Sequence, residues 1–274
     1  MRWFVLIFVM FLAGCAHKTD HRWLGYAEGD YIYVSAPQAG WIVNLYVKRG
    51  EQVKPGEKLF NLDDTYQVAM LNQAKAQIAE AKSQVSQAHA NLKLTREELK
   101  RAQALLPIGG ASRRDYDLAE TKYETALAQV AQFTANQNVA RAAFSAAQYQ
   151  LSQREVVSRT NGTVQDIYFR KGEYAPAMTP VIEVLPPVNI YVRFFVPERD
   201  FARLHLGKNV LISCDACAKA IKARITFIAK REEFTPPVIF SQESREKLVF
   251  EAEARAPGGL KLNPGQPVDV RPAQ

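Results

Sequence analysis

Apolar and small residues recur at alternating steps of three and four through the middle of the chain, first from Leu71 to Leu106 and again from Tyr116 to Leu151. Such steps keep one stripe on one helical face, and in both runs large residues alternate with small ones. The pattern predicts two long antiparallel helices that pack along a heptad seam. The predicted seam consists of Leu71, Ala74, Ile78, Ala81, Val85, Ala88, Leu92, Thr95, Leu99, Ala102 and Leu106 in the first arm and Tyr116, Ala119, Tyr123, Ala126, Val130, Phe133, Gln137, Ala140, Phe144, Ala147 and Leu151 in the second.

Glycine and proline are almost absent from this part of the chain. Of 14 Gly and 14 Pro, residues 57–161 contain only Pro107, Gly109 and Gly110. These three residues interrupt the helical pattern once, and Ser112 is placed to cap the second helix. At 1.5 Å per residue, each arm is expected to be ~63–68 Å long.

The segments that flank the helical insert are copies of each other. Shifted by 122 residues, Gly40–Glu51 aligns without a gap with Gly162–Glu173, and Tyr46 falls on Tyr168. Each copy has the pattern of a strand, a tight turn at glycine and a second strand. Because neither half can bury its apolar face alone, we expect the two to form one small β-sandwich, split by the helical hairpin.

The last third of the chain is expected to be β-structure. After Pro186-Pro187, the segment 189–196 is apolar and aromatic, and residues 221–227 and 248–254 alternate between apolar and polar. This pattern predicts a small antiparallel barrel, with one short helix at 197–204. The predicted fold class is therefore α+β, elongated and multidomain: a split β-sandwich, which resembles a lipoyl domain, an inserted coiled-coil hairpin and a β-barrel.

The N-terminus has the pattern of an export signal. Its apolar run, Trp3–Leu12, is too short to span a bilayer and has the length of a signal peptide. The run ends in Leu-Ala-Gly-Cys15, which resembles the bacterial lipobox, in which the cysteine is lipidated. The alternative is an ordinary signal peptide followed by a chance cysteine. The expected segments are a signal peptide at 1–14, a lipid-anchored tether at 15–27, sandwich halves at 28–64 and 158–187, the hairpin at 65–157 and the barrel at 188–274, with a minimal membrane-proximal end.

The order of these segments resembles the periplasmic adaptor, or membrane fusion, proteins of the HlyD-like family. The resemblance covers nearly the whole chain from about residue 28. It implies a periplasmic protein, anchored by Cys15 to the inner membrane, that forms a homo-oligomer, expected to be a hexamer. Its partners would be an inner-membrane transporter and a TolC-like outer-membrane channel. Ala16 departs from the Asp that inner-membrane lipoproteins of enteric type usually carry, so the membrane of residence stays open.

In that family, a channel-docking motif of Arg, Leu and Ser lies at the hairpin tip. Arg101, Leu105 and Ser112 match its spacing, and Tyr116 and Asp117 extend the likeness. Each residue also has an ordinary interpretation: a solvated helix charge, a core leucine and a helix cap.

The segment 234–241 and the compact C-terminus resemble the adaptors that serve ABC-type exporters. Efflux or secretion through such an exporter is the expected function. The alternatives are the adaptor of a proton-driven pump, a structural spacer lipoprotein of the envelope, and a lipoyl or biotinyl carrier subunit. A carrier needs a lysine where the two sandwich halves join, and Asp63-Asp64-Thr65 stands there instead.

Composition adds little chemistry of its own. The net charge of +7 suits acidic partners or anionic lipid. Cys214 and Cys217 are expected to form a local disulfide after export, with metal binding and redox catalysis as alternatives. His17 and His21 lie in the tether, where metal delivery is a remote alternative. No catalytic motif or nucleic-acid module is found, so we expect no enzyme activity, no cofactor and no resident metal.

Overall fold

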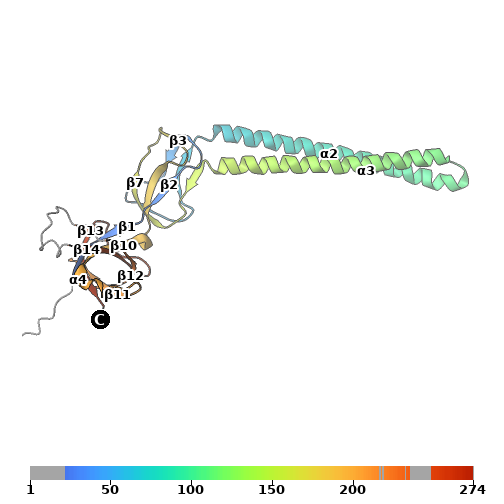
Figure 1. The fold of residues 1–274 in the computed structure, drawn as a ribbon. Helices are drawn as coiled ribbons and strands as arrows, with labels where there is room; N and C mark the ends of the chain where they lie inside the picture. The colour runs from blue at the N-terminus through green and yellow to red at the C-terminus, as the bar shows by residue number, and fades with distance from the viewer. Residues whose placement is uncertain (1–21, 216, 218, 232, 235–247, 274) are drawn as a thin grey trace, which may run out of the picture. The chain divides into compact units, whose positions relative to one another are not determined.

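The computed structural model describes residues 22–215, 217, 219–231, 233–234 and 248–273. The chain forms two compact units (Figure 1). One consists of Tyr33–Thr160 with Val164–Glu183 and holds the sandwich and the hairpin. The other consists of the residues before, between and after these ranges and holds the barrel.

The hairpin consists of α2 (Thr65–Leu105) and α3 (Arg113–Ser152), joined through the short 3₁₀ helix η1 (Leu106–Ile108). At 1.5 Å per residue, helices of 41 and 40 residues are ~60 Å long. Every residue of the predicted seam is buried or half-buried, so the prediction is confirmed. The most deeply buried seam positions carry small side chains, because only small side chains fit where the two helices approach closely: Ala74, Ala81, Ala88, Thr95, Ala119 and Ala126.

Two four-stranded sheets make up the sandwich, and each combines strands from both halves of the sequence repeat. The first sheet has the order β2 (Ile32–Ser35), β9 (Pro180–Leu185), β7 (Gly162–Ile167), β4 (Gln52–Val53), and the second has the order β6 (Glu155–Val157), β5 (Lys58–Leu62), β3 (Gly40–Leu45), β8 (Tyr174–Ala175). Each strand of one sheet thus has its repeat counterpart at the same place in the other. The short strands β4 and β8 cross over to the sheet of the opposite half.

Backbone hydrogen bonds repeat with the same offset as the sequence. The N–H of Gly50 donates to the carbonyl of Val164, and 122 residues later the N–H of Gly172 donates to the carbonyl of Ile42, both at 2.8 Å. Both glycines have positive φ, +83° and +87°, so the turn that starts each crossover strand needs a residue without Cβ. The sequence repeat is therefore a structural repeat with approximate twofold symmetry.

One position breaks this symmetry. The N–H of Gly56 donates to the carbonyl of Ser158, and the equivalent N–H, of Met178, donates to the carbonyl of Ala36. Met178 keeps the left-handed backbone of its glycine counterpart, with φ of +60°, although this conformation is unfavourable for a residue with a side chain. Its side chain is exposed.

The barrel is a six-stranded antiparallel sheet with the order β10 (Ile190–Pro197), β1 (Trp23–Gly29), β15 (Pro267–Pro272), β11 (Asn209–Ser213), β12 (Ile221–Ile228), β14 (Leu248–Arg255). Pairing of β10 with β14 closes it, and β13 (Glu233–Phe234) adds to the edge of β14. The 3₁₀ helix η2 (Pro187–Asn189) precedes β10, and the short helix α4 (Glu198–Phe201) follows it. Alternate side chains fill the interior, among them Phe194, Ile212 and Ile225. The predicted fold class is confirmed.

Two predicted boundaries are wrong. The sequence predicts a tether at 23–27 and the start of the sandwich at 28–29, but Trp23–Gly29 forms barrel strand β1, where Trp23 stacks on Phe194 at 5.7 Å between ring centroids. The hairpin, predicted to end at residue 157, ends as a helix at Ser152, because residues 155–157 pair with β5 as a strand. With three residues, β6 is too short to show a period of two, whereas the seven residues of β1 show no regular alternation of buried and exposed positions.

Gly25 tests how closely β1 packs in the barrel. A Cβ at this position would lie 2.4 Å from the carbonyl oxygen of Arg193 and 2.7 Å from the Cβ of Phe194. We expect Gly25→Ala to destabilise the barrel by about 1–3 kcal/mol, because backbone rather than a flexible side chain would have to move. The measurement is urea unfolding followed by hydrogen exchange of the barrel amides. Leu24→Ala, at a neighbouring exposed position, is the control and should change stability by less than about 0.5 kcal/mol; equal effects of the two changes would contradict this packing.

Candidate docking site at the hairpin tip

The turn between the two long helices is short and locally determined. After Leu105 the chain makes one 3₁₀ turn that starts with proline near its first position, and Gly109 then takes a left-handed conformation with φ of +72°. The N–H of Gly110 donates to the carbonyl of Leu105 at 2.9 Å, which satisfies one of the last carbonyls of α2. The Pro-x-Gly-Gly segment therefore reverses the chain within a few residues.

Ser112 caps the second helix by a reciprocal pair of hydrogen bonds. Its Oγ accepts from the N–H of Asp115 at 3.1 Å, while an Asp115 carboxylate oxygen accepts from the N–H and the Oγ–H of Ser112. These bonds to the ionised carboxylate lower the pKa of Asp115. The contribution to stability is therefore complete above the ordinary carboxyl pKa and is lost as pH falls through the lower folded value. The predicted cap is present in the structure.

Two apolar side chains are exposed at the tip. Leu105 is 42% exposed and lies against Gly110, since a Cβ on that glycine would be 3.2 Å from a Leu105 methyl carbon. The seam position at this level is the next residue, Leu106, so Leu105 is not part of the hairpin core. Ile108 is 76% exposed, more than Leu105, and the sequence analysis did not single it out. Its position in the break between two helical patterns was the signal that could have revealed it.

Positive charge surrounds these apolar groups. Arg101 and Leu105 lie one turn apart on the same face of α2, and both are exposed. At the start of α3, Arg114 is exposed, and Arg113 pairs with Asp117 at 3.1 Å and lies over the ring of Tyr116. The structure thus brings Arg101, Leu105 and Ser112 to one end of the hairpin, where Leu105 and Ile108 are exposed at the turn and Leu118 is 55% exposed in the second turn of α3.

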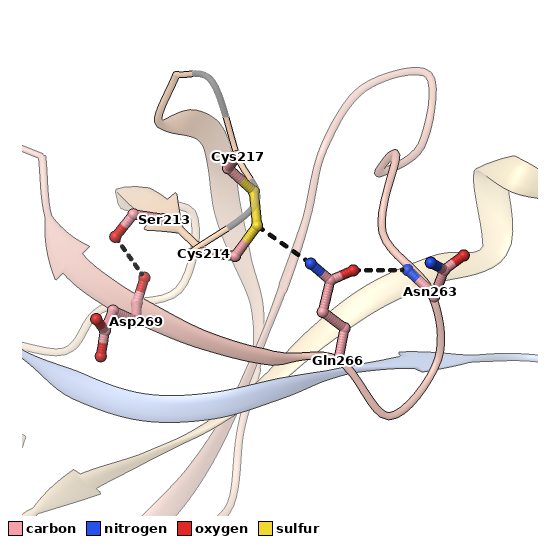
Figure 2. The surroundings of a disulfide bond; sticks show 6 residues. All are labelled: Ser213, Cys214, Cys217, Asn263, Gln266 and Asp269. Atoms are coloured by element: carbon pink, nitrogen blue, oxygen red, sulfur yellow. Dashed lines mark hydrogen bonds between the residues drawn. A yellow bond between two sulfur atoms is a disulfide. The ribbon is translucent and has the colours of Figure 1, made fainter.

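A second candidate site, in the barrel unit, contains a disulfide between Cys214 and Cys217, whose Cα atoms are 5.0 Å apart (Figure 2). The side-chain N–H of Gln266 donates to the Cys214 sulfur at 3.2 Å, and its carbonyl oxygen accepts from the N–H of Asn263. An open cavity of about 710 Å³ lies beside the disulfide, with Lys219 and Lys261 among its lining residues. In this state neither sulfur is a thiolate available to a metal or to redox chemistry.

Several predicted features lie outside the described residues. These are the lipidation site Cys15, with the signal peptide and Ala16, and nearly all of the segment 234–241. Within the described part of the chain, no cluster of three or more His, Cys, Asp or Glu could hold a metal ion. In the same residues, neither long helix is apolar enough to cross a bilayer.

Where a carrier protein would present its lysine, this chain begins a helix. The Oδ1 of Asp63 accepts from the N–H and Oγ–H of Thr65, the first residue of α2, and these bonds lower the pKa of the Asp63 carboxyl. The connection between the two sandwich halves is thus the hairpin itself. A swinging arm has no attachment point at this junction.

Comparison with known proteins agrees with this geometry. Residues 70–154 match the family model of the alpha-helical hairpin domain of RND membrane fusion proteins. The chain is 24% identical over 273 residues to the colistin resistance protein EmrA of Acinetobacter baumannii, covering 84% of this chain and 75% of that protein. It is 29% identical over 194 residues to the pyoverdine export membrane fusion protein PvdR of Pseudomonas putida, covering 69% of this chain and 49% of PvdR. The chain therefore spans about half the length of some of the curated relatives that it matches.

Solved structures show the same fold. MacA from Actinobacillus actinomycetemcomitans superposes with a TM-score of 0.73 at 20% identity, over 93% of this chain and 79% of MacA. The membrane fusion protein Spr0693 from Streptococcus pneumoniae R6 gives 0.62 at 16% identity, over 92% of this chain and 98% of that one. Residues 70–154 thus match the hairpin domain of membrane fusion proteins, and the chain shares the fold of these two solved structures.

Ser112→Ala tests the cap at the tip. We expect it to destabilise the start of α3 by about 1 kcal/mol, because it leaves the N–H of Asp115 without its acceptor. The pKa of Asp115 should also rise toward its ordinary value. Both are measured by NMR, through amide exchange at residues 113–116 and carboxyl titration. Ser83→Ala, which removes an exposed mid-helix hydroxyl bonded to the carbonyl of Ala79, is the control; an unchanged Asp115 pKa in the Ser112 variant would contradict the capping geometry.

The disulfide is tested by alkylation of protein isolated from the cell envelope under non-reducing, denaturing conditions. We expect no label on Cys214 or Cys217 before reduction and label on both afterwards, because the bonded sulfurs are not nucleophilic. Mass spectrometry of the peptide that contains both residues gives the count. Quantitative labelling of both without reductant would show that the pair is reduced in the cell.

Proposed function

We propose that this protein is the periplasmic adaptor of an export system and that its hairpin tip docks on a TolC-like outer-membrane channel. The observation that carries the proposal is the exposed pair Leu105 and Ile108, held at the tip by a short turn and a capped helix. Exposed apolar side chains on a rigid turn are suited to bury against a partner at small cost in conformational entropy. The family match of the hairpin and the names of relatives such as PvdR support an export role.

Arg101, Leu105 and Ser112 have separate parts in this proposal. Leu105, with Ile108, is the apolar anchor that enters the channel end. Arg101, one turn away on the same face, donates charge-assisted hydrogen bonds to carbonyl groups across the helix–helix contact. Ser112 holds the first turn of α3 in place, and its hydroxyl oxygen keeps one further lone pair for a partner donor. Arg113 and Arg114 favour an acidic channel mouth.

At the other end of the system we propose an ABC-type exporter in the inner membrane, on the sequence resemblance of residues 234–241. The adaptor would be anchored to that membrane through lipidated Cys15 and would act as a homo-oligomer, expected to be a hexamer. Its role is mechanical: it forms a conduit and couples it to the exporter, without a catalytic step of its own. In this compartment the disulfide of Cys214 and Cys217 would be stable.

The main alternative is the adaptor of a proton-driven pump, and the description of the matching hairpin model, which names RND systems, supports it. Photo-crosslinking from the barrel in living cells distinguishes the two, since the captured inner-membrane protein is either an ATPase-linked exporter or a proton-driven pump. A spacer lipoprotein would capture neither, and a deletion strain would keep normal drug tolerance and export.

Leu105→Asp and Ile108→Asp test the docking role. We expect each to lower transport at least tenfold, because a carboxylate would be buried without a partner at the channel contact. Helical circular dichroism and oligomeric state should be unchanged, since neither side chain belongs to the seam. Val139→Asp, at a 70% exposed position in the middle of α3, is the matched control and should leave transport intact.

A photo-reactive residue at position 105 identifies the docking partner directly. Capture of an outer-membrane channel protein, lost in the Ile108→Asp background, is the expected result. Full transport by both aspartate variants, or self-crosslinks alone, would overturn the docking proposal and favour the spacer.

A further inference from the structure

The chain enters the barrel and reaches its last described residue at the same end of it. Strand β15 runs antiparallel to β1, with Val270 opposite Trp23, and Pro272 lies opposite Val210 at the start of β11. The N–H of Ala273 donates to the carbonyl of Asn209 at 3.2 Å. The loop at residues 202–208, which joins α4 to β11, therefore lies at the end where the N-terminal segment joins the barrel.

This loop fixes one leucine inside the barrel and another outside it. Leu204 is buried in the barrel core, whereas Leu206, two residues later, is 67% exposed. Gly207, with φ of +81°, donates its N–H to the carbonyl of Ile225, and the N–H of Ile225 returns a bond to Lys208. The loop is thus pinned to β12 on one side of Leu206 and to the core on the other. Its exposed leucine is held outward by fixed backbone.

Basic side chains lie on the same loop as this leucine and on the strand to which the loop is bonded. Arg203 and Lys208 are exposed on the loop, and Arg224 is exposed on β12 opposite Asn209. Phe227, three residues beyond Arg224, is 47% exposed. We call Arg203, Leu206, Lys208, Arg224 and Phe227 the rim surface. Lys230 and Arg231, after β12, and Arg199, on α4, add exposed positive charge near it.

Among the side chains that the structure describes, few exposed carboxylates lie at this end of the barrel. Asp200 is buried and accepts from the indole N–H of Trp23, and Asp269 pairs with Arg22. Among the side chains that the structure describes here, Glu198 carries the exposed carboxylate. The rim surface therefore combines projecting apolar groups with net positive charge, the combination that binds an anionic bilayer surface.

We propose that the rim surface binds the anionic lipid headgroups of the membrane in which the protein is anchored. The proposal rests on the lipid anchor at Cys15 that is part of the proposed function. A lipidated Cys15 is eight residues from Trp23, and at up to ~3.6 Å per residue the tether reaches at most ~29 Å. The end of the barrel that carries the rim surface is therefore held within that distance of the bilayer. Leu206 and Phe227 enter the interface, and Arg203, Lys208 and Arg224 contact lipid phosphates.

Lipid binding by the rim surface also orients the protein on the bilayer, which a lipid anchor alone does not do. One acyl group gives reversible attachment, and two acyl chains hold more firmly, but neither orients the protein. A basic and apolar surface at the tethered end fixes which side of the barrel faces the bilayer. The partner is thus a lipid surface, and a protein bound at the same rim is an outcome that the test distinguishes.

Vesicle binding of the chain from residue 16 onward tests the proposal, because this chain keeps every described residue and lacks the lipid. We expect sedimentation with vesicles of phosphatidylglycerol mixed with phosphatidylcholine and none with phosphatidylcholine alone. Lys208→Gln and Arg224→Gln should each weaken binding about fivefold, since a basic residue near an anionic surface contributes about 1 kcal/mol. Leu206→Ser should weaken it about tenfold or more, because it removes a buried apolar side chain.

Matched controls lie at the opposite end of the same barrel. Val188, which is 59% exposed before β10, and Lys219 and Lys261, both exposed beside the disulfide, have the same chemistry as the rim residues. Val188→Ser, Lys219→Gln and Lys261→Gln should leave vesicle binding within twofold. If substitutions at both ends of the barrel weakened vesicle binding equally, the attraction would be that of any basic protein and the proposal would be overturned. Absence of binding, or equal binding to both kinds of vesicle, would also overturn it.

The result is independent of channel docking. Failure of the tip crosslink would remove the adaptor proposal but would leave vesicle binding as measured. Conversely, a crosslink from position 206 that captures an inner-membrane protein, together with absent vesicle binding, would overturn the lipid proposal and leave the adaptor proposal standing.

Discussion

The structure depends on the pairing of two half-motifs that are separated by the whole hairpin. Gly50 and Glu51 bond to Val164, and Gly172 and Glu173 bond to Ile42, so each half supplies the edge that the other lacks. Forming these contacts requires closure of a loop of roughly a hundred residues, an entropic cost that grows only slowly with length. The hairpin lowers that cost, because its own seam brings its two ends together. Pairing of the two helices thus brings the two sandwich halves together, and the folded sandwich in turn fixes the ends of both helices that adjoin it.

Much of this fold could be predicted from residues that repeat. The alternation of large and small residues from Leu71 to Leu151 defines both the helices and their contact face, and the offset of 122 residues defines the two sandwich halves. The exchange of β4 and β8 between sheets could not be predicted, since two residues have no detectable period. Strand β1 was missed for a related reason: Gly25 removes one side chain from the alternation, and the packing that requires it is contributed by Phe194, far away in sequence.

The candidate docking site likewise combines features that could be predicted from the sequence with features that could not. Ser112 could be placed as a cap from sequence, because capping depends on residues within one turn, and the structure supplies its partner Asp115. The exposure of a side chain, in contrast, is not determined by the residues within one turn of it. Leu105 and Leu106 are identical in type and adjacent, yet only Leu105 projects from the tip, and Ile108 projects further. Likewise, the rim surface depends on which end of a barrel a loop occupies, which follows from strand pairing across more than two hundred residues.

The heptad spacing of the buried positions Ala74, Ala81, Ala88 and Thr95 sets more than the contact between the helices. A strict seven-residue repeat makes two helices wind around each other with a left-handed pitch of about 150 Å. Over ~60 Å the pair turns through somewhat less than half a revolution, so the direction in which Leu105 faces is fixed by the number of heptads below it. The length of the hairpin and the direction in which its tip faces are therefore coupled. Lengthening each arm by one heptad moves the tip outward by ~10 Å and rotates its face by about 25°. In a ring of identical subunits, the length of the hairpin thus also determines the angle at which each tip faces.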